Sequence, residues 1–143
     1  MVCDATGQQF ILVTGTGNSF AANAIDYNLY SGTTQSALEF IWRTGSSTQV
    51  SCSSYSSWKT TSGQDGHSLF TPAANTQIVT SAATGDYTLF STSSAVNAGD
   101  PSFVAASGEK DYGGQSRIAS SRVDIGADEY MTNAQAWRDL YFA

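Results

Sequence analysis

The octapeptide VDIGADEY, residues 123–130, says more about the fold than any other stretch of this sequence. Val123 and Ile125 stand on either side of Asp124, and successive side chains in extended backbone point to opposite faces. We therefore expect Val123 and Ile125 to fill an apolar interior, with the carboxylate of Asp124 available to a cationic partner.

Two acids, Asp111 and Asp124, lie close in sequence to two bases, Arg117 and Arg122. Hydrogen bonds between carboxylate and guanidinium groups are stronger than those between neutral groups. The spacing predicts ion pairs from these arginines to the two aspartates, which would hold the last turn in place.

The composition favours an all-β, turn-rich protein. Charged residues make up 13% of the chain, against about 25% in average proteins, whereas helix surfaces normally rely on Glu, Lys and Arg. The net charge of −6 argues against partners such as nucleic acid or an anionic membrane, because both require clustered Lys and Arg. A basic or neutral glycan remains open as a ligand. Cys3 and Cys52 either form one disulfide or are two buried thiols, and their spacing fits no metal site.

Apolar periodicity predicts a series of short strands. The run 10–13 is continuously apolar, as in a strand covered on both faces. The runs 25–30 and 37–43 alternate, which is typical of half-buried strands. Further short strands are expected within 67–70, 77–80 and 87–90.

Two short helical segments are also expected. The first is a turn that Ser56 or Ser57 caps and Gly63 ends. The second begins at Thr132, which is followed three residues later by glutamine and so matches a capping box. It predicts an amphipathic helix over 134–140 that packs on the end of the domain.

Six short motifs occur in an order that resembles the C-terminal part of bacterial right-handed parallel β-helix proteins, the pectate-lyase-like superfamily. They are DYNLYSG at 26–32, YSSWKTTSGQDGHSLF at 55–70, GDYTL at 85–89, SSAVNAGD at 93–100, KDYGGQSR at 110–117 and VDIGADEY at 123–130. In such relatives the last motif closes the helical part. Thr71 stands before Pro72 where relatives tend to carry an acidic residue, so a contact through that carboxylate is absent.

The resemblance implies a short right-handed parallel β-helix in a single domain, with coils and closing turn in 1–130 and a helical tail in 131–143. Periodicity alone leaves a β-sandwich equally open. Relatives keep their sugar-processing residues on middle coils, so this chain would hold only the end of a longer architecture. Its first coil would lack a neighbour, and we expect a homo-oligomer in which another copy covers that N-terminal coil. Relatives are typically secreted or at the cell surface, but no signal peptide is evident here and localisation remains open.

The resemblance also directs attention to acidic and aromatic side chains. Lyases on this fold use acids, often with calcium, and a basic residue that takes a proton from the sugar. The candidate catalytic residues are Asp111, Arg117, Arg122 and Asp124. The candidate Ca²⁺ ligands are Asp124, Asp128 and Glu129. The candidate sugar-stacking residues are Tyr30, Tyr55 and Tyr112. Against each stands the ordinary interpretation of a solvated acid, a salt bridge or a core aromatic ring.

These observations favour a non-catalytic terminal or assembly module of a β-helix protein with weak carbohydrate binding and no required cofactor. The first alternative is a polysaccharide lyase or glycoside hydrolase whose site is completed at a subunit interface. The second is a truncated fragment without selected activity. His67, the single histidine, is a possible general base, although a lone histidine beside a turn is usually a polar surface or edge residue.

Overall fold

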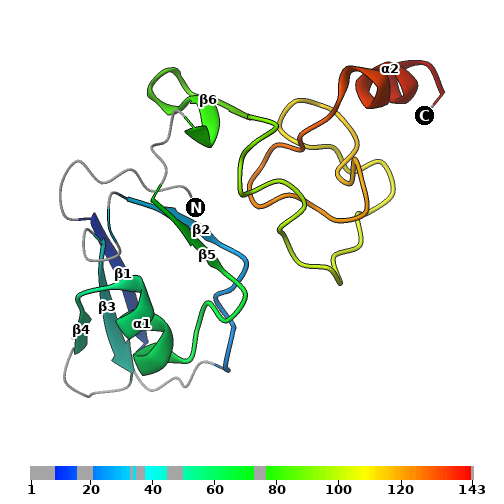
Figure 1. The fold of residues 1–143 in the computed structure, drawn as a ribbon. Helices are drawn as coiled ribbons and strands as arrows, with labels where there is room; N and C mark the ends of the chain where they lie inside the picture. Colours follow the sequence, from blue (N-terminus) through cyan, green and yellow to red (C-terminus); the bar gives the residue numbers. More distant parts are fainter. Residues whose placement is uncertain are drawn as a thin grey trace. The chain divides into compact units, whose positions relative to one another are not determined.

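The computed structural model describes residues 9–15, 21–32, 34, 38–44, 50–72 and 77–142. Within them the elements are, in chain order, β1 (Gln9–Gly15), β2 (Leu29–Ser31), β3 (Leu38–Thr44), β4 (Val50–Cys52), α1 (Tyr55–Ser62), β5 (Leu69–Thr71), β6 (Val79–Ser81), the 3-10 helix η3 (Ala82–Thr84), β7 (Asp86–Leu89) and α2 (Asn133–Phe142) (Figure 1). The chain divides into two compact units, unit 1 (Met1–Ala74) and unit 2 (Asn75–Ala143). The expectation of a single domain remains a prediction.

Unit 1 contains two small sheets. In one, β1 pairs with β3 in parallel and β4 pairs with the other side of β3 in antiparallel, while β2 and β5 form a separate parallel pair. The strands expected within 10–13 and 37–43 are confirmed. The run 25–30 is extended only at its end, because Tyr27 has a left-handed backbone (φ 52°) that interrupts the strand.

An aromatic cluster forms the core of unit 1. Its buried members are Tyr30, Phe40, Trp42, Cys52, Tyr55 and Trp58. The Phe40 ring stacks on Trp58 with centroids 5.2 Å apart, and Trp42 meets Trp58 edge-on at 5.4 Å. Cys52 is a free thiol, fully buried, as one of the two interpretations expected; Cys3 lies outside the described residues. These rings hold α1 against β3 and β4.

Helix α1 has a well-defined start and end. Ser54 is its N-cap and accepts a hydrogen bond from the Ser57 N–H at 3.1 Å, so the expectation of a cap at Ser56 or Ser57 is wrong. Gly63 ends the helix as predicted. Its φ of 66° is left-handed, and its N–H donates to the Lys59 carbonyl.

Beside α1, a fully buried carboxylate, Asp65, connects three parts of unit 1. Its Oδ1 accepts from the Asn28 amide and the Ser68 hydroxyl. Its Oδ2 accepts from the Tyr30 hydroxyl at 2.9 Å and from the Trp58 indole N–H at 2.6 Å. A buried charge is tolerated only when its lone pairs are satisfied, and Asp65 meets that condition with four donors.

The expected right-handed parallel β-helix is wrong, as is the alternative β-sandwich. A solenoid requires parallel strands stacked coil upon coil, but in the described residues the parallel contacts are two isolated pairs, β1–β3 and β2–β5. The strands β4, β6 and β7 pair in antiparallel, which a right-handed parallel β-helix does not allow. Alternation misled us because it indicates a half-buried strand of any kind and says nothing about which strand lies beside it.

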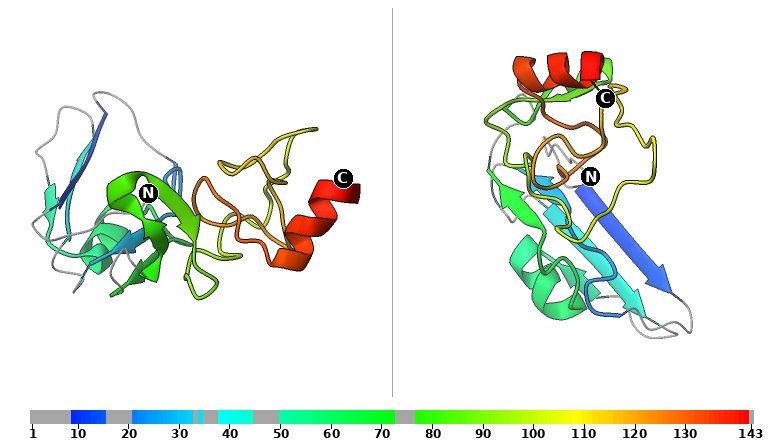
Figure 2. Two further views of the ribbon diagram at one scale, coloured as in Figure 1. Left: turned by 90° about the horizontal axis from the view of Figure 1, so that it is seen from above. Right: turned by 90° about the vertical axis from the view of Figure 1, so that its right-hand side faces the viewer.

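Unit 2 consists largely of turns. The hairpin of β6 and β7 pairs Val79 with Leu89, and the region from 90 to 132 contains neither a named strand nor a helix (Figure 2). Hydrogen bonds across the turns hold this region, for example from the Gly99 N–H to the Val123 carbonyl at 2.8 Å and from the Ile125 N–H to the Ala95 carbonyl at 2.9 Å. This segment, which is rich in Ser, Gly and Asn, therefore forms turns in place of the β-helix coils that were expected.

Helix α2 confirms the capping box but not the packing predicted for it. The Thr132 N–H donates to the Gln135 side chain at 2.9 Å, and the Gln135 N–H donates back to the Thr132 hydroxyl. Trp137 and Tyr141, expected to be covered, are 58% and 63% exposed. No helix in the described ranges has the length and apolar character that a bilayer crossing requires.

Candidate functional site

The closing turn of unit 2 brings the predicted acids together. Val123 and Ile125 are buried, which confirms the prediction for both side chains. Asp124 is also buried, and its carboxylate accepts N–H groups from Asn97 at 2.5 Å and Tyr130 at 2.6 Å. Asp124 therefore holds two segments of backbone in place.

The arginines do not pair as predicted. Arg117 forms an ion pair with Glu129 and donates to the Gly126 carbonyl. Arg122 donates to two backbone carbonyls, those of Ala98 and Gly99. The expected pairing of these arginines with Asp124 is wrong, because backbone N–H groups nearer to its oxygens already occupy them.

Burial changes the acidity of this cluster. Desolvation raises the pKa of Glu129 to about 7, although the Asp124 N–H and the Arg117 guanidinium act in the opposite direction. Desolvation likewise raises the pKa of Asp124 against the effect of its two backbone donors. Asp111 is buried and accepts N–H groups from Gln115 at 2.7 Å and from Glu129 at 3.0 Å. The candidate catalytic acids thus serve mainly to organise turns.

A pocket of about 260 Å³ opens beside this cluster. Its lining residues are Thr88, Leu89, Gly113, Gln115, Asp128, Glu129, Tyr130 and Met131. The strand β7, the turn after Asp111 and the closing turn therefore each contribute to one concave surface. A hydrogen bond from the Tyr112 N–H to the Ala127 carbonyl at 2.7 Å fixes the second of these to the third.

Asp128 is the acid most directly placed to meet a ligand in that pocket. It is 6% exposed, and its Oδ2 accepts the Leu89 N–H at 3.1 Å. Its Oδ1 has no hydrogen-bond donor among the described residues. Desolvation raises the pKa of Asp128, and the nearby charges of Asp111, Asp124 and Asp86 add to this effect. An acceptor that is buried and lacks a donor is rare in proteins, and it marks a place where a ligand or water donates.

Gly113 makes room for that oxygen. A Cβ atom at Gly113 would lie 3.4 Å from Oδ1 of Asp128 and 3.4 Å from Oδ1 of Asp111. Such a distance is ordinary van der Waals contact, so a methyl group would fit but would cover the carboxylate oxygens. Glycine therefore leaves the two acids open to a molecule in the pocket.

Two exposed tyrosines flank the pocket residues in sequence. Tyr112 is 66% exposed and Tyr87 46% exposed, and their rings meet edge-to-face with centroids 6.4 Å apart. Tyr112 precedes Gly113, and Tyr87 precedes Thr88, both of which line the pocket. Sequence reasoning missed Tyr87, because alternation along 87–90 places it on the face of Leu89, which is buried.

The other two aromatic candidates do not reach the surface. Tyr30 is 2% exposed and Tyr55 6% exposed, so the prediction that they are exposed sugar-stacking residues is wrong. The Tyr30 hydroxyl donates to Asp65, and the Tyr55 hydroxyl donates to the Ser68 carbonyl. Both rings pack in the aromatic core of unit 1, and their hydroxyl groups form hydrogen bonds with polar groups beside it.

The candidate Ca²⁺ ligands remain a prediction. In the described residues no three His, Cys, Asp or Glu side chains converge as metal binding requires. Asp124 and Glu129 use their oxygens on backbone N–H groups and on Arg117.

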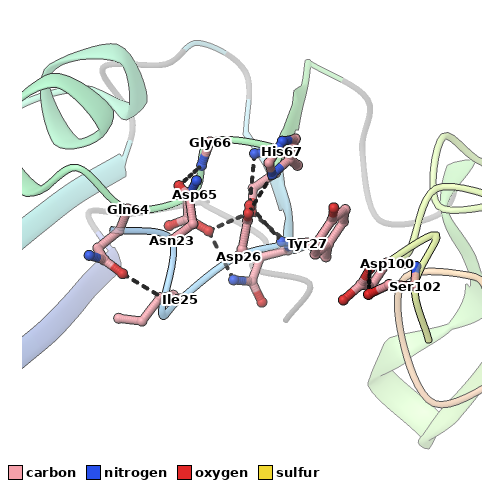
Figure 3. Close-up of polar contacts among 12 residues, drawn as sticks. Asn23, Ile25, Asp26, Tyr27, Gln64, Asp65, Gly66, His67, Asp100 and Ser102 are labelled. Atoms are coloured by element: carbon pink, nitrogen blue, oxygen red, sulfur yellow. Dashed lines mark hydrogen bonds and ion pairs between the residues drawn. The ribbon is translucent and has the colours of Figure 1, made fainter. Parts of the chain in front are cut away.

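Unit 1 has a separate polar cluster around His67 (Figure 3). The Asp26 carboxylate lies 2.6 Å from Nδ1 of His67 and accepts the backbone N–H of His67 at 2.7 Å. Tyr27 stacks on the imidazole with centroids 5.2 Å apart. Burial alone would raise the pKa of Asp26, but the hydrogen bonds from His67 and Tyr27 lower it. His67 is exposed at the surface, as its ordinary interpretation expected, and it joins the turn at 64–66 to the loop before β2.

Comparison with protein-family models, with curated proteins and with solved structures finds no match to this chain.

Proposed function

We propose that unit 2 binds carbohydrate without catalysis, at a surface made of Tyr87, Tyr112 and the pocket that Asp128 lines. The pair of exposed tyrosine rings is the observation that carries this proposal. Aromatic rings exposed beside a concave polar surface are suited to sugars, because the C–H face of a pyranose packs on a ring while its hydroxyls find hydrogen-bond partners.

The polar half of such a site is present in the pocket. Oδ1 of Asp128 is a fixed acceptor for a sugar hydroxyl, since the Leu89 N–H holds the other oxygen in place. The hydroxyl group of Thr88 and the amide of Gln115 come from two further segments of the lining. A small number of convergent polar groups beside an apolar platform is the usual arrangement in ligand sites.

The proposal of binding without catalysis is supported by the contacts that the acids and Arg117 make. A lyase requires a base near the α-proton of a sugar, and Arg117 is engaged by Glu129 and the Gly126 carbonyl. Asp124 and Asp111 accept backbone N–H groups through both of their oxygens. The enzyme alternative remains a prediction, and release of unsaturated or reducing sugars from acidic and neutral polysaccharides would establish it.

The test is a titration of the whole chain with a neutral tetrasaccharide, N-acetylchitotetraose, followed by NMR or calorimetry. We expect a dissociation constant on the order of 1 mM, which corresponds to about 4 kcal/mol. Tyr112→Ala and Tyr87→Ala should each weaken binding about fivefold, in line with the roughly 1 kcal/mol that a ring contact contributes. Tyr141→Ala is the matched control, because Tyr141 is an equally exposed tyrosine in the last turn of α2.

Equal loss of binding in Tyr141→Ala would show that the response is not specific to the proposed surface. Unchanged binding in both Tyr112→Ala and Tyr87→Ala would contradict the proposal outright.

The predicted homo-oligomer loses its original basis, because the open coil that motivated it is absent from the described residues. Light scattering over micromolar concentrations measures the oligomeric state directly, and a strictly monomeric protein would end that hypothesis.

A further inference from the structure

We infer that the pocket of unit 2 selects a protonated amino sugar, a hexosamine unit whose nitrogen carries no acetyl group, over neutral and acidic sugars. This inference rests on the proposed function and specifies which glycan the surface takes.

The first argument is the charge of the pocket. The acid that lines it with an oxygen free of donors among the described residues is Asp128, and the residues of the lining include no lysine, arginine or histidine. Asp86 and Asp111 act electrostatically on Asp128 from nearby. Arg117, which approaches the cluster, is paired with Glu129 and is directed to that acid. The electrostatic potential in the pocket therefore favours a cation.

The second argument is the free oxygen of Asp128. It is buried, it lacks a donor among the described residues, and Gly113 leaves it uncovered. A neutral hydroxyl can donate one hydrogen bond to it, whereas an ammonium group donates a charge-assisted bond that is roughly twice as strong. The ammonium group has two further N–H donors, and these can serve Oδ1 of Asp111 or solvent.

The third argument is the tyrosine pair. Tyr87 and Tyr112 are exposed and adjoin in sequence the lining residues Thr88 and Gly113, and exposed aromatic faces attract ammonium groups at distances up to about 6 Å. A uronate brings a carboxylate to the same place. It would face Asp128 with no basic residue in the lining to compensate, so acidic glycans should be rejected.

The experiment compares three tetrasaccharides on the whole chain by calorimetry: fully deacetylated chitotetraose, its N-acetylated form and tetragalacturonate. At a pH of about 6 the free amines are largely protonated. We expect the deacetylated form to bind at least about tenfold more tightly than the acetylated form, since a charge-assisted hydrogen bond contributes about 1.5–3 kcal/mol. Tetragalacturonate should not bind.

Two variants locate the effect. Asp128→Asn should weaken binding of both forms but reduce the preference for the deacetylated form to less than about twofold, because the amide carries no charge. Gly113→Ala should do the same by covering the carboxylate oxygen with a methyl group that fits without a clash, so a folding defect in one variant does not leave the idea without a test. Circular dichroism checks that each variant is folded.

The outcomes separate the two proposals. Equal or tighter binding of the acetylated form overturns the amino-sugar inference and leaves the proposed carbohydrate function standing. A preference for the deacetylated form that survives in both variants also overturns it, because the charge would then act elsewhere. Binding of none of the three sugars overturns the inference together with the proposed function.

Discussion

Replacing Asp65 by alanine should severely destabilise unit 1. The carboxylate accepts four hydrogen bonds, two of which come from groups that are essentially closed to water: the indole N–H of Trp58 and the hydroxyl of Tyr30. An unsatisfied buried donor costs about 1–3 kcal/mol, so these two alone predict a loss of about 2–6 kcal/mol. Since small proteins are stable by only about 5–15 kcal/mol, this is a large share of the total.

The variant Asp65→Asn is the matched comparison, because it keeps the shape and removes the charge. The single carbonyl oxygen of the asparagine can accept the hydrogen bonds from Trp58 and Tyr30 if its NH₂ group faces Ser68 and Asn28. The Ser68 hydroxyl can rotate and the Asn28 amide can flip, so that each accepts a hydrogen bond from that NH₂ group. We therefore expect a smaller loss, about 1–3 kcal/mol, and for Tyr30→Phe about 1 kcal/mol.

Urea unfolding of the whole chain, followed by tryptophan fluorescence and far-ultraviolet circular dichroism, measures these differences as shifts in midpoint. The order of destabilisation should be Asp65→Ala, then Asp65→Asn, then Tyr30→Phe. A loss below about 1 kcal/mol for Asp65→Ala would refute the view that this carboxylate holds unit 1 together.

Three further predictions concern pH and backbone conformation. The pKa of Glu129 rises from 4.5 to about 7 on folding, so its contribution to stability is fully present below pH 4.5 and is lost as pH rises to about 7. Glu129→Gln should flatten the decline of the urea midpoint across this window. An unchanged slope would contradict the assignment. Hydrogen bonds lower the pKa of Asp26 below 3.8, so its contribution to stability is present above that pH and is lost as pH falls through the lowered value. On acid titration, Asp26→Asn should therefore lose stability less steeply than the wild type. Identical acid unfolding curves would argue against this role of Asp26. Gly63→Ala should lower the free energy of unfolding by about 1 kcal/mol, because φ at this position is 66° and alanine is strained there. The added methyl group meets nothing within 4 Å, so no steric clash contributes. An unchanged urea midpoint would show that alanine is not strained at this left-handed position.

Local features of this fold were accessible from sequence. The strand at 38–44, the end of α1 at Gly63 and the capping box of α2 were all predicted. Each depends on a few neighbouring residues, whose backbone preferences and side-chain spacing act within one turn or one strand. Burial of Val123 and Ile125 also followed from short-range pattern.

The candidate site was only partly accessible. Sequence singled out Asp128, which lines the pocket, and Tyr112, which is exposed and precedes the lining residue Gly113, but it did not select Tyr87. Tyr112 and Tyr87 lie far apart in the chain, and sequence spacing carries no information about which loops meet. The pairing of Asp26 with His67, 41 residues away, was missed for the same reason.

By itself, then, the sequence determined the strands within 10–13 and 37–43, the end of α1 at Gly63 and the capping box of α2, and it marked Val123 and Ile125 as a buried apolar pair. Only the tertiary structure decided what those elements become together: three small sheets among the described residues in place of a stacked solenoid, Glu129 in place of Asp124 as the partner of Arg117, and core positions for Tyr30 and Tyr55. The physical reason is that alternation and charge spacing constrain each segment alone, while strand pairing, desolvation and ion-pair choice depend on which distant segments pack against one another.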